Sequence, residues 1–582
     1  MRKIVFIAAM LLTAALLSNK TIAQTAAYDR PTVNFLLITH GDAYDAPTSA
    51  FFGKMPKEDK FYYNELGVKD IKMSQMPRSS VSPTNWQPML AELTRQNVAK
   101  KEVAAWYLRK PDGSMSMDLI HRRGEFNATD ETFLMANATK RGMDELKDLG
   151  RKLISKTYVV ALNYANITYA ADASADIHTW KSTAQAMVFK LKFDTEMENS
   201  IYDAWPDEQD TPEAMAEKSK QFDQIPFALE FVQQVSVSAT ASALITGKPR
   251  GEQSSVQSLA KIGMSVTSKD ALWNEMLKKG YNNVVGELEK KIADFQVKSG
   301  VLELDPIRAK IGKKEGLKTD QRYYVLEYEQ NSKGKLKAVR KAVVRVGSGV
   351  ADNRAMATGK SEASKFYQIA GRKVEKGMTL EQRNDAGIGV LMGGGLPITS
   401  KEEEVQLQMR IEVLTNKVLN LGVFPSLYVY AEGIMENTRY SLKSNFINDY
   451  ELTADNGKAN YTFMRWGFGL GRGLYFWRNF SISPYVGMGW EYVSVKDDIS
   501  LETIYYKAGA NFAVNIYYPF QLVGGVSGLF YGAPKFDSNS NSNSNSDDSS
   551  SSASTSLSSY GDVFGDRSSG SASGFVGIRF NF

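Results

Sequence analysis

The chain lacks cysteine altogether and has only three histidines among its 582 residues. Without cysteine it can form no disulfide, no thiolate metal site and no cysteine-linked lipid anchor. The histidines are His40, His121 and His178, so none lies beyond residue 384. The last third of the chain therefore has no histidine to serve as a general base, and we expect no enzymatic site there.

Long apolar runs are also missing beyond the N-terminus. A membrane-spanning helix needs about 20 apolar residues, and no later segment supplies them. The apolar run Ile4–Leu17 follows Arg2 and Lys3 and leads to Ala23. This pattern is typical of a secretory signal peptide, so we expect residues 1–23 to be removed. Any membrane insertion of the remaining chain must then use strands.

The chain has no strong excess of charge of either sign. Its net charge is +5, and lysine and arginine are spread along the sequence rather than clustered. This distribution lacks the electrostatic footprint of a nucleic-acid-binding protein. A chain of this length is compatible with about three domains.

The last twelve residues alternate between two kinds of side chain. Val576, Ile578, Phe580 and Phe582 fall on one face of a strand, whereas Phe575, Gly577, Arg579 and Asn581 fall on the other. An apolar face toward lipid, a polar face toward a lumen and a terminal aromatic are typical of the closing strand of an outer-membrane barrel. Phe580 and Phe582 are the expected C-terminal signature.

Seven similar segments precede this strand. The eight expected strands cover residues 386–395, 405–413, 426–440, 463–468, 482–492, 504–516, 520–531 and 571–582. Alternation in one segment is weak evidence, but an even series of such segments predicts a closed barrel. The fold class is therefore an α+β soluble region followed by a C-terminal antiparallel transmembrane β-barrel of about eight strands, in residues 385–582.

The inward positions of these strands carry charges of both signs. They are Arg410, Glu412, Glu432, Arg465, Glu491, Lys507 and Arg579. An eight-stranded barrel is just wide enough for side chains to fill it. Because unpaired buried charges are costly, we expect these residues to pair across the lumen and plug it. A role in gating a pore is the alternative.

The connection before the last strand contains Ser538–Ser559, which is almost wholly Ser, Asn and Asp. Such a segment cannot bury enough apolar surface to offset its ordering entropy, so we expect residues 537–560 to be a disordered extracellular loop. It could be a surface tether or simply a tolerated insertion in an exposed loop.

The part before the barrel is soluble in character. Residues 24–300 mix apolar strands, such as Thr157–Leu162, with helical stretches at 132–153, 256–264, 269–279 and 282–297, which predicts an α/β or α+β domain. Residues 301–384 are richer in strand signals and turn glycines and resemble small SH3-like or OB-like barrels. The barrel topology predicts that both parts are periplasmic.

One short segment could support chemistry in the soluble part. Thr39–Asp45 places His40 beside Asp42 and Asp45 after an expected strand. No metal-binding or nucleophile motif accompanies it, so we interpret it as a solvated turn. We expect no catalytic residue, no metal and no cofactor.

The C-terminal third resembles the OmpA/OmpX-like outer-membrane barrels. The signal peptide with Gln24 after Ala23 and the terminal Phe582 resemble the corresponding features of secreted proteins of the Bacteroidetes. The resemblance implies fold and location, not activity. The main hypothesis is a non-enzymatic outer-membrane protein that anchors a periplasmic interaction module, with lipid, the barrel assembly machinery and a periplasmic or cell-wall component as partners. A surface adhesin or narrow channel is the first alternative, and a barrel-tethered periplasmic hydrolase is the second.

Overall fold

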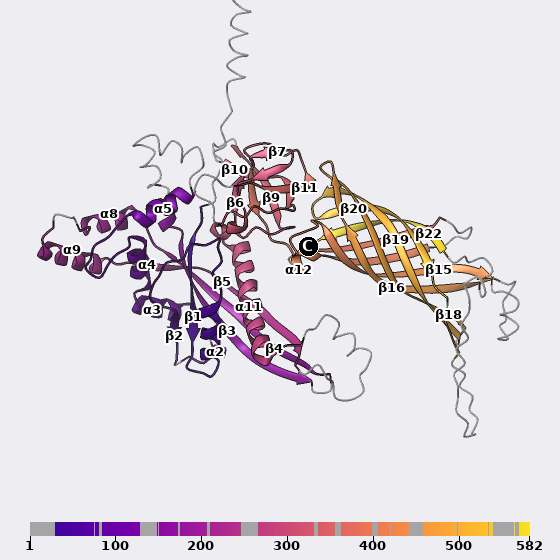
Figure 1. The fold of residues 1–582 in the computed structure, drawn as a ribbon, viewed down its shortest axis with the longest axis horizontal. Helices are drawn as coiled ribbons and strands as arrows, with labels where there is room; N and C mark the ends of the chain where they lie inside the picture. Colours follow the sequence, from indigo (N-terminus) through magenta and orange to yellow (C-terminus); the bar gives the residue numbers. More distant parts are fainter. Residues whose placement is uncertain are drawn as a thin grey trace, which may run out of the picture.

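The computed structural model is elongated and has three parts in chain order (Figure 1). We call them the α/β domain (residues 29–295), the β module (298–384) and the barrel (388–582). The structure describes residues 29–74, 76–80, 84–127, 148, 150–172, 175–206, 210–245, 266–330, 336–354, 362–398, 405–419, 421–441, 458–496, 499–533, 535–538, 564 and 570–582.

The α/β domain is built on a five-stranded sheet with the order β2-β1-β3-β4-β5. Its strands are β1 (Thr32–Thr39), β2 (Asp70–Lys72), β3 (Thr157–Asp172), β4 (Ile177–Leu191) and β5 (Leu229–Leu244). β1 runs parallel to β2 and β3, whereas β3, β4 and β5 are antiparallel neighbours. The sheet is therefore mixed, and its described helices are α2 (Asp45–Lys54), α3 (Gln87–Arg95), α4 (Val98–Trp106), α5 (Asp118–Asn127), α8 (Thr195–Asp203), α9 (Pro212–Gln224) and α11 (Lys269–Lys291).

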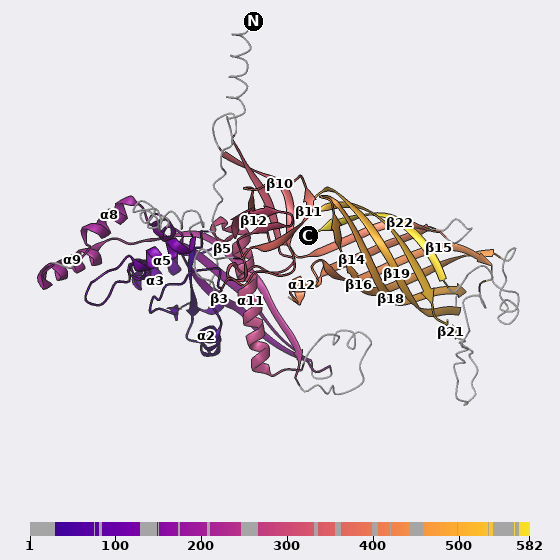
Figure 2. The same ribbon diagram turned by 45° about the horizontal axis from the view of Figure 1, so that its top comes forward.

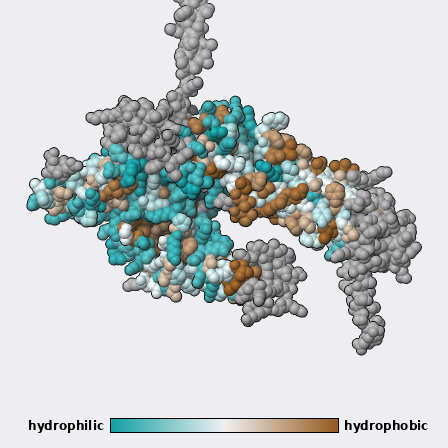
Figure 3. Space-filling model, in the orientation of Figure 1, coloured by the Kyte–Doolittle hydropathy of each residue, from teal (hydrophilic) through white to brown (hydrophobic). Residues whose placement is uncertain are grey.

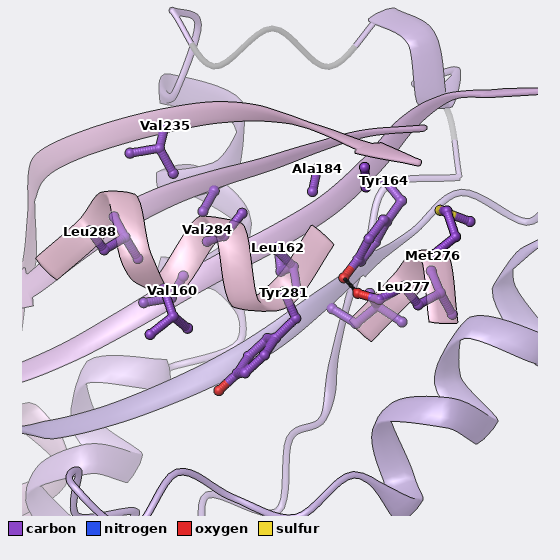
Figure 4. Packing of buried hydrophobic residues seen from close by; sticks show 14 of the residues in the cluster. Val160, Leu162, Tyr164, Ala184, Val235, Met276, Leu277, Tyr281, Val284 and Leu288 are labelled. Carbon is purple, nitrogen blue, oxygen red and sulfur yellow. Dashed lines mark hydrogen bonds between the residues drawn. The ribbon is translucent and has the colours of Figure 1, made fainter. Parts of the chain in front are cut away.

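Helix α11 crosses one face of this sheet (Figure 4). Its N-cap Ser268 accepts a hydrogen bond from the backbone N–H of Ala271. The Tyr164 hydroxyl donates to the carbonyl of Leu277 at 2.7 Å. The predicted pair of helices at 269–279 and 282–297 is wrong, because α11 continues through Gly280. A Cβ at Gly280 would lie 2.7 Å from the Tyr164 ring, so glycine permits the close approach of helix and sheet.

The β module contains a seven-stranded sheet with the order β6-β12-β9-β10-β11-β8-β7. The strands are β6 (Lys298–Gly300), β7 (Glu303–Leu304), β8 (Ile307–Ala309), β9 (Arg322–Gln330), β10 (Leu336–Val346), β11 (Ser364–Gly371) and β12 (Thr379–Gln382). It lies between the α/β domain and the barrel in both ribbon views (Figure 2). Its apolar core includes Val325, Val344 and Leu380.

The predicted fold class is confirmed, because eight antiparallel strands close into a barrel. They are β13 (Ile388–Pro397), β14 (Val405–Leu414), β15 (Leu427–Ser441), β16 (Lys458–Arg472), β18 (Phe480–Lys496), β19 (Ile499–Tyr517), β20 (Phe520–Tyr531) and β22 (Gly570–Asn581). The β13–β22 and β18–β19 pairings complete the ring. The short strands β17 (Leu474–Phe476) and β21 (Lys535–Ser538) extend it. Helix α12 (Thr415–Val418) follows β14.

The outer face of the barrel is apolar, as its strand alternation predicts. On β16, the outward row Trp466, Phe468 and Leu470 is about half exposed. Apolar residues gather over the side of the barrel in the space-filling view, whereas hydrophilic residues prevail on the α/β domain (Figure 3). This distribution matches a barrel of the outer-membrane type, with hydrocarbon against its outer surface.

Inside the barrel, tyrosines pack over glycines of neighbouring strands. A Cβ at Gly469 would lie 2.6 Å from the Tyr430 ring, and one at Gly487 would lie 2.3 Å from the Tyr430 hydroxyl. The lumen also holds a small apolar cluster of Leu391, Ala513, Val523 and Phe575. The inner face is therefore not polar throughout, and large rings occupy the space that glycine leaves free.

Several predicted segments lie outside the described residues. These are the signal peptide 1–23, most of the helix predicted at 132–153, the helix predicted at 256–264 and nearly all of the Ser-rich loop. Among the helices that the structure does describe, none combines the length and apolarity needed to cross a membrane.

Candidate functional site: the charged lumen and the closed end of the barrel

The seven charges predicted for the lumen are all buried, at 6% exposure or less, and fall into three clusters. In the first, the Glu432 carboxylate lies 2.7 Å from Arg410 and 3.0 Å from Lys507. In the second, Arg465 pairs with both Glu436 and Glu491. In the third, Arg579 lies 3.1 Å from Glu412. We call these eight side chains the lumen charge network.

The network is electrically balanced. It contains four cations, Arg410, Arg465, Lys507 and Arg579, and four carboxylates, Glu412, Glu432, Glu436 and Glu491. Because buried charges need partners, this balance removes most of the penalty for filling the lumen with polar groups. Sequence reasoning missed Glu436, although it shares the inward parity of Glu432 on β15 and could have been found from that spacing.

Neutral side chains fill the space around Arg410. Its guanidinium lies 4.1 Å from the ring centres of both Tyr430 and Tyr485. Gln408 donates to the Glu432 carboxylate at 2.9 Å. The arginine is therefore enclosed by cation–π contacts as well as by its ion pair, which leaves its side chain fully buried.

The two C-terminal signature residues face outward. Phe580 is 39% exposed and Phe582 is 59% exposed. The Phe580 ring packs edge-on against Phe520 of the next strand, with centroids 5.3 Å apart. The chain ends at the end of the barrel near the β module (Figure 1), where the Phe582 carbonyl accepts a hydrogen bond from the backbone N–H of Gly387 at 3.1 Å.

This end carries three connections, at 415–426, 473–479 and 518–519, and we call it the turn end. The β module contacts all three. Asp320 accepts hydrogen bonds from the backbone N–H of Ser426 and the amide of Asn416, both at 2.8 Å. The N–H of Gly371 donates to Asn479 at 2.6 Å. Arg322 donates to the Tyr518 hydroxyl at 2.7 Å. The β module thus covers the turn end.

Asp385, just before β13, is the electrostatic centre of this contact. Its side chain is fully buried and pairs with Arg345 of the β module and, at 2.9 Å, with Lys417 of α12. Burial opposes ionisation of Asp385, but attraction from Arg345, Lys417 and Arg322 outweighs it and lowers the pKa to about 2. Asp385 therefore stays charged and pairs with one cation from the β module and one from the barrel.

A small cavity separates the β module from the lumen. A cavity of about 50 Å³ lies there, lined by Arg345, Tyr428, Tyr475, Tyr518 and Arg579 among others. This volume is enough for one or two waters. Residues of the β module and of the three connections line this cavity, so the two parts meet over the turn end.

The α/β domain is joined to the β module by buried polar contacts. Arg30 lies 2.9 Å from Glu315. Glu289 of α11 pairs with Lys60 and accepts from Gln382 at 3.0 Å and from Asn384. These contacts connect residues that are distant in sequence, so the two parts are tied at several points.

The structure bears out the exposed turn at residues 41–43 but corrects the interpretation for His40, which is buried. His40 is 7% exposed, and its ring nitrogens lie 2.8 Å from the Met76 carbonyl and 3.0 Å from Asn163 Oδ1. Asp42 and Asp45 both pair with Arg78. The sequence could not show this, because Met76, Arg78 and Asn163 come from distant segments. These contacts fix the position of the end of β1. The ring nitrogens of His40 contact a backbone carbonyl and an amide oxygen rather than a hydroxyl that could act as a nucleophile.

A buried acid lies deeper in the α/β domain. Glu102 of α4 is fully buried and accepts hydrogen bonds from Asn34 at 2.6 Å and Asn64 at 2.7 Å. Burial raises the pKa of Glu102 to about 7, although both amides and nearby Arg123 oppose this shift. Among the described residues, no group of three or more acidic or histidine side chains is arranged to hold a metal ion.

Comparisons with known proteins give similarity of fold only. No family profile matches the chain, and no curated protein matches it. Among solved structures, the chain is similar to a major outer membrane protein from Thermus thermophilus, at 11% identity and a TM-score of 0.21, over 34% of this chain and 98% of that one. It is also similar to the outer membrane protease OmpT from Escherichia coli, at 10% identity and a TM-score of 0.15, over 46% and 94% of the two chains. At this level nothing about activity follows.

Proposed function

We propose that this protein is a non-enzymatic outer-membrane anchor, whose closed barrel holds the α/β domain and the β module at the periplasmic side. The observation that carries the proposal is the filled barrel. Its lumen contains a balanced charge network, and its turn end is covered by the β module. A barrel built in this way would act as a membrane anchor for the other two parts rather than as a channel.

The proposed orientation follows from the lengths of the connections. In outer-membrane barrels the short turns face the periplasm and the long loops face outside. The longest connection at the turn end is 415–426, whereas the opposite end carries the two longest connections of the barrel, 442–457 and 532–569, beside two short ones. The β module contacts the turn end, so the preceding domain would lie in the periplasm and the Ser-rich loop outside.

The partner would be a periplasmic protein or the cell wall, bound by the α/β domain. Strand β5 supports this role, because it is sixteen residues long and lies at the edge of its sheet. Asn283 and Lys291 of α11 cover the carbonyls of Ser238 and Gln234, which blunts part of this edge. The Leu244 carbonyl at its end accepts from Thr267 at 2.9 Å. Between these points, the edge could offer backbone groups to an extended partner segment.

Protease accessibility on intact cells tests the orientation. One epitope tag is inserted near Ser544 and another near Asp210. We expect protease to remove only the Ser544 tag on intact cells and both tags after permeabilisation. Removal of the Asp210 tag on intact cells would place the α/β domain outside and would favour the adhesin instead.

The channel alternative is tested on the same purified protein in a planar bilayer. The filled lumen predicts no steady ion conductance above that of the bare membrane. A stable single-channel current from wild-type protein would contradict the anchor proposal. If no current is seen, crosslinking from the α/β domain in living cells would identify the proposed periplasmic component.

A further inference from the structure

The β module and the barrel together form a groove of about 340 Å³ beside the turn end. The β module contributes Lys365, Phe366 and Tyr367, and the barrel contributes Arg472, Leu474 and Phe476. We infer that this groove binds one anionic phospholipid of the adjacent leaflet. The inference takes from the proposed function only that the barrel spans a bilayer.

The first argument is continuity with the lipid-facing surface. On β16 the outward row runs Trp466, Phe468, Leu470 and then Arg472, the last residue of the strand. An outward arginine after a row of half-exposed apolar side chains lies at the depth where hydrocarbon gives way to head groups. Leu474 and Phe476, which follow it, are 37% and 47% exposed. The groove therefore continues the barrel's membrane surface.

The second argument is charge. Two cations, Lys365 and Arg472, line the groove, and none of its lining residues is acidic. Within the part of the chain that the structure describes, neither cation has an ion-pair partner, and Nε of Arg472 is buried without a hydrogen bond. The guanidinium of Arg472 lies 5.8 Å from the ring centre of Phe424, which is 57% exposed. A phosphate diester fits these donors.

The third argument is the combination of both features in one place. Free phosphate would use the two cations but would leave the apolar side of the groove uncovered. A neutral lipid would cover the apolar side but would leave two cations without a counter-charge. An anionic phospholipid satisfies both, with its phosphate between Lys365 and Arg472 and an acyl chain along Leu474 and Phe476. Since one cation comes from each part, the lipid would join the β module to the barrel.

The test is native mass spectrometry of the full chain, released from detergent micelles doped with equal phosphatidylglycerol and phosphatidylcholine. We expect wild-type protein to retain one phosphatidylglycerol. Lys365→Gln and Arg472→Gln should each lower the retained fraction by about fivefold, because a cation near an anionic head group contributes about that factor. Leu474→Ser should lower retention without removing a charge.

Lys341→Gln is the matched control, because the Lys341 ammonium already pairs with Glu327 and Glu329 within the β module. Its retention of lipid should equal that of wild type. Equal retention by the Lys365→Gln/Arg472→Gln double variant and wild type would overturn the inference, as would equal retention of the two lipids or full displacement by inorganic phosphate. Lys365→Gln alone, on the β module, keeps the test valid if Arg472 variants do not fold. The readout does not depend on orientation, so its failure would leave the proposed function untouched.

Discussion

At the scale of single residues, Glu102 makes the stability of the α/β domain depend on pH. Its folded pKa of about 7 lies above the ordinary value of 4.5, so the folded state binds more protons between these two pH values. Stability contributed by protonated Glu102 is therefore complete below about pH 4.5 and is lost as the pH rises to about 7. We expect a loss of about 3 kcal/mol over this range, seen as a falling melting temperature of the full chain in detergent.

Glu102→Gln should remove this dependence. The Asn64 side-chain oxygen is buried without a hydrogen-bond partner, so turning the Asn64 amide would let it accept from the new amide at position 102. The variant should melt at nearly the same temperature at pH 5 and pH 8, measured by near-ultraviolet circular dichroism. A wild-type-like fall with pH in this variant would show that another group is responsible.

The contribution of Asp385 to stability depends on pH in the opposite direction to that of Glu102. Its folded pKa of about 2 lies below the ordinary value of 3.8, so its ionised form stabilises the contact with the β module above about pH 4. That stabilisation is lost as the pH falls from about 4 to about 2. At neutral pH, Asp385→Asn should cost about 3–5 kcal/mol, because it leaves the buried Arg345 and the partly buried Lys417 without a counter-charge.

Limited proteolysis of the full chain in detergent measures this effect as faster cleavage between the β module and the barrel. Asp352→Asn is the control, because Asp352 pairs with Arg354 and Lys313 at an exposed site. It should leave the cleavage rate near that of wild type. Unchanged cleavage of Asp385→Asn would mean that the three turn contacts hold the β module without this ion pair.

At the scale of elements, the barrel strands depend on inward glycines. A Cβ at Gly469 would lie 2.2 Å from the Val486 carbonyl and 2.6 Å from the Tyr430 ring, so Gly469→Ala must displace a strand or a ring. We expect a cost of about 1–3 kcal/mol. The midpoint temperature at which the folded barrel loses its fast gel mobility should fall. Gly433→Ala on β15 is the control, since nothing lies within 4 Å of its added Cβ, and it should leave the midpoint unchanged.

The elements of the barrel could be predicted from the sequence better than those of the α/β domain. Strand alternation is local, so all eight barrel strands could be found from the chain itself. The continuity of α11 through Gly280 and the burial of His40 depend on Tyr164, Met76 and Asn163, which are distant in sequence. Glu436 lay within reach of the alternation rule. The covering of the turn end could not be predicted from strand alternation, because Asp320 and Arg322 belong to another part of the chain.

At the scale of the whole molecule, the covered turn end sets an order of assembly. The β module contacts connections that follow β14, β16 and β19, so its docking surface is complete only after these strands have met. Docking would then be the last step of biogenesis, and it would report that the barrel has closed. A chain stalled with an open barrel would keep its β module undocked, and the β module would then be more accessible to proteases than in the assembled protein.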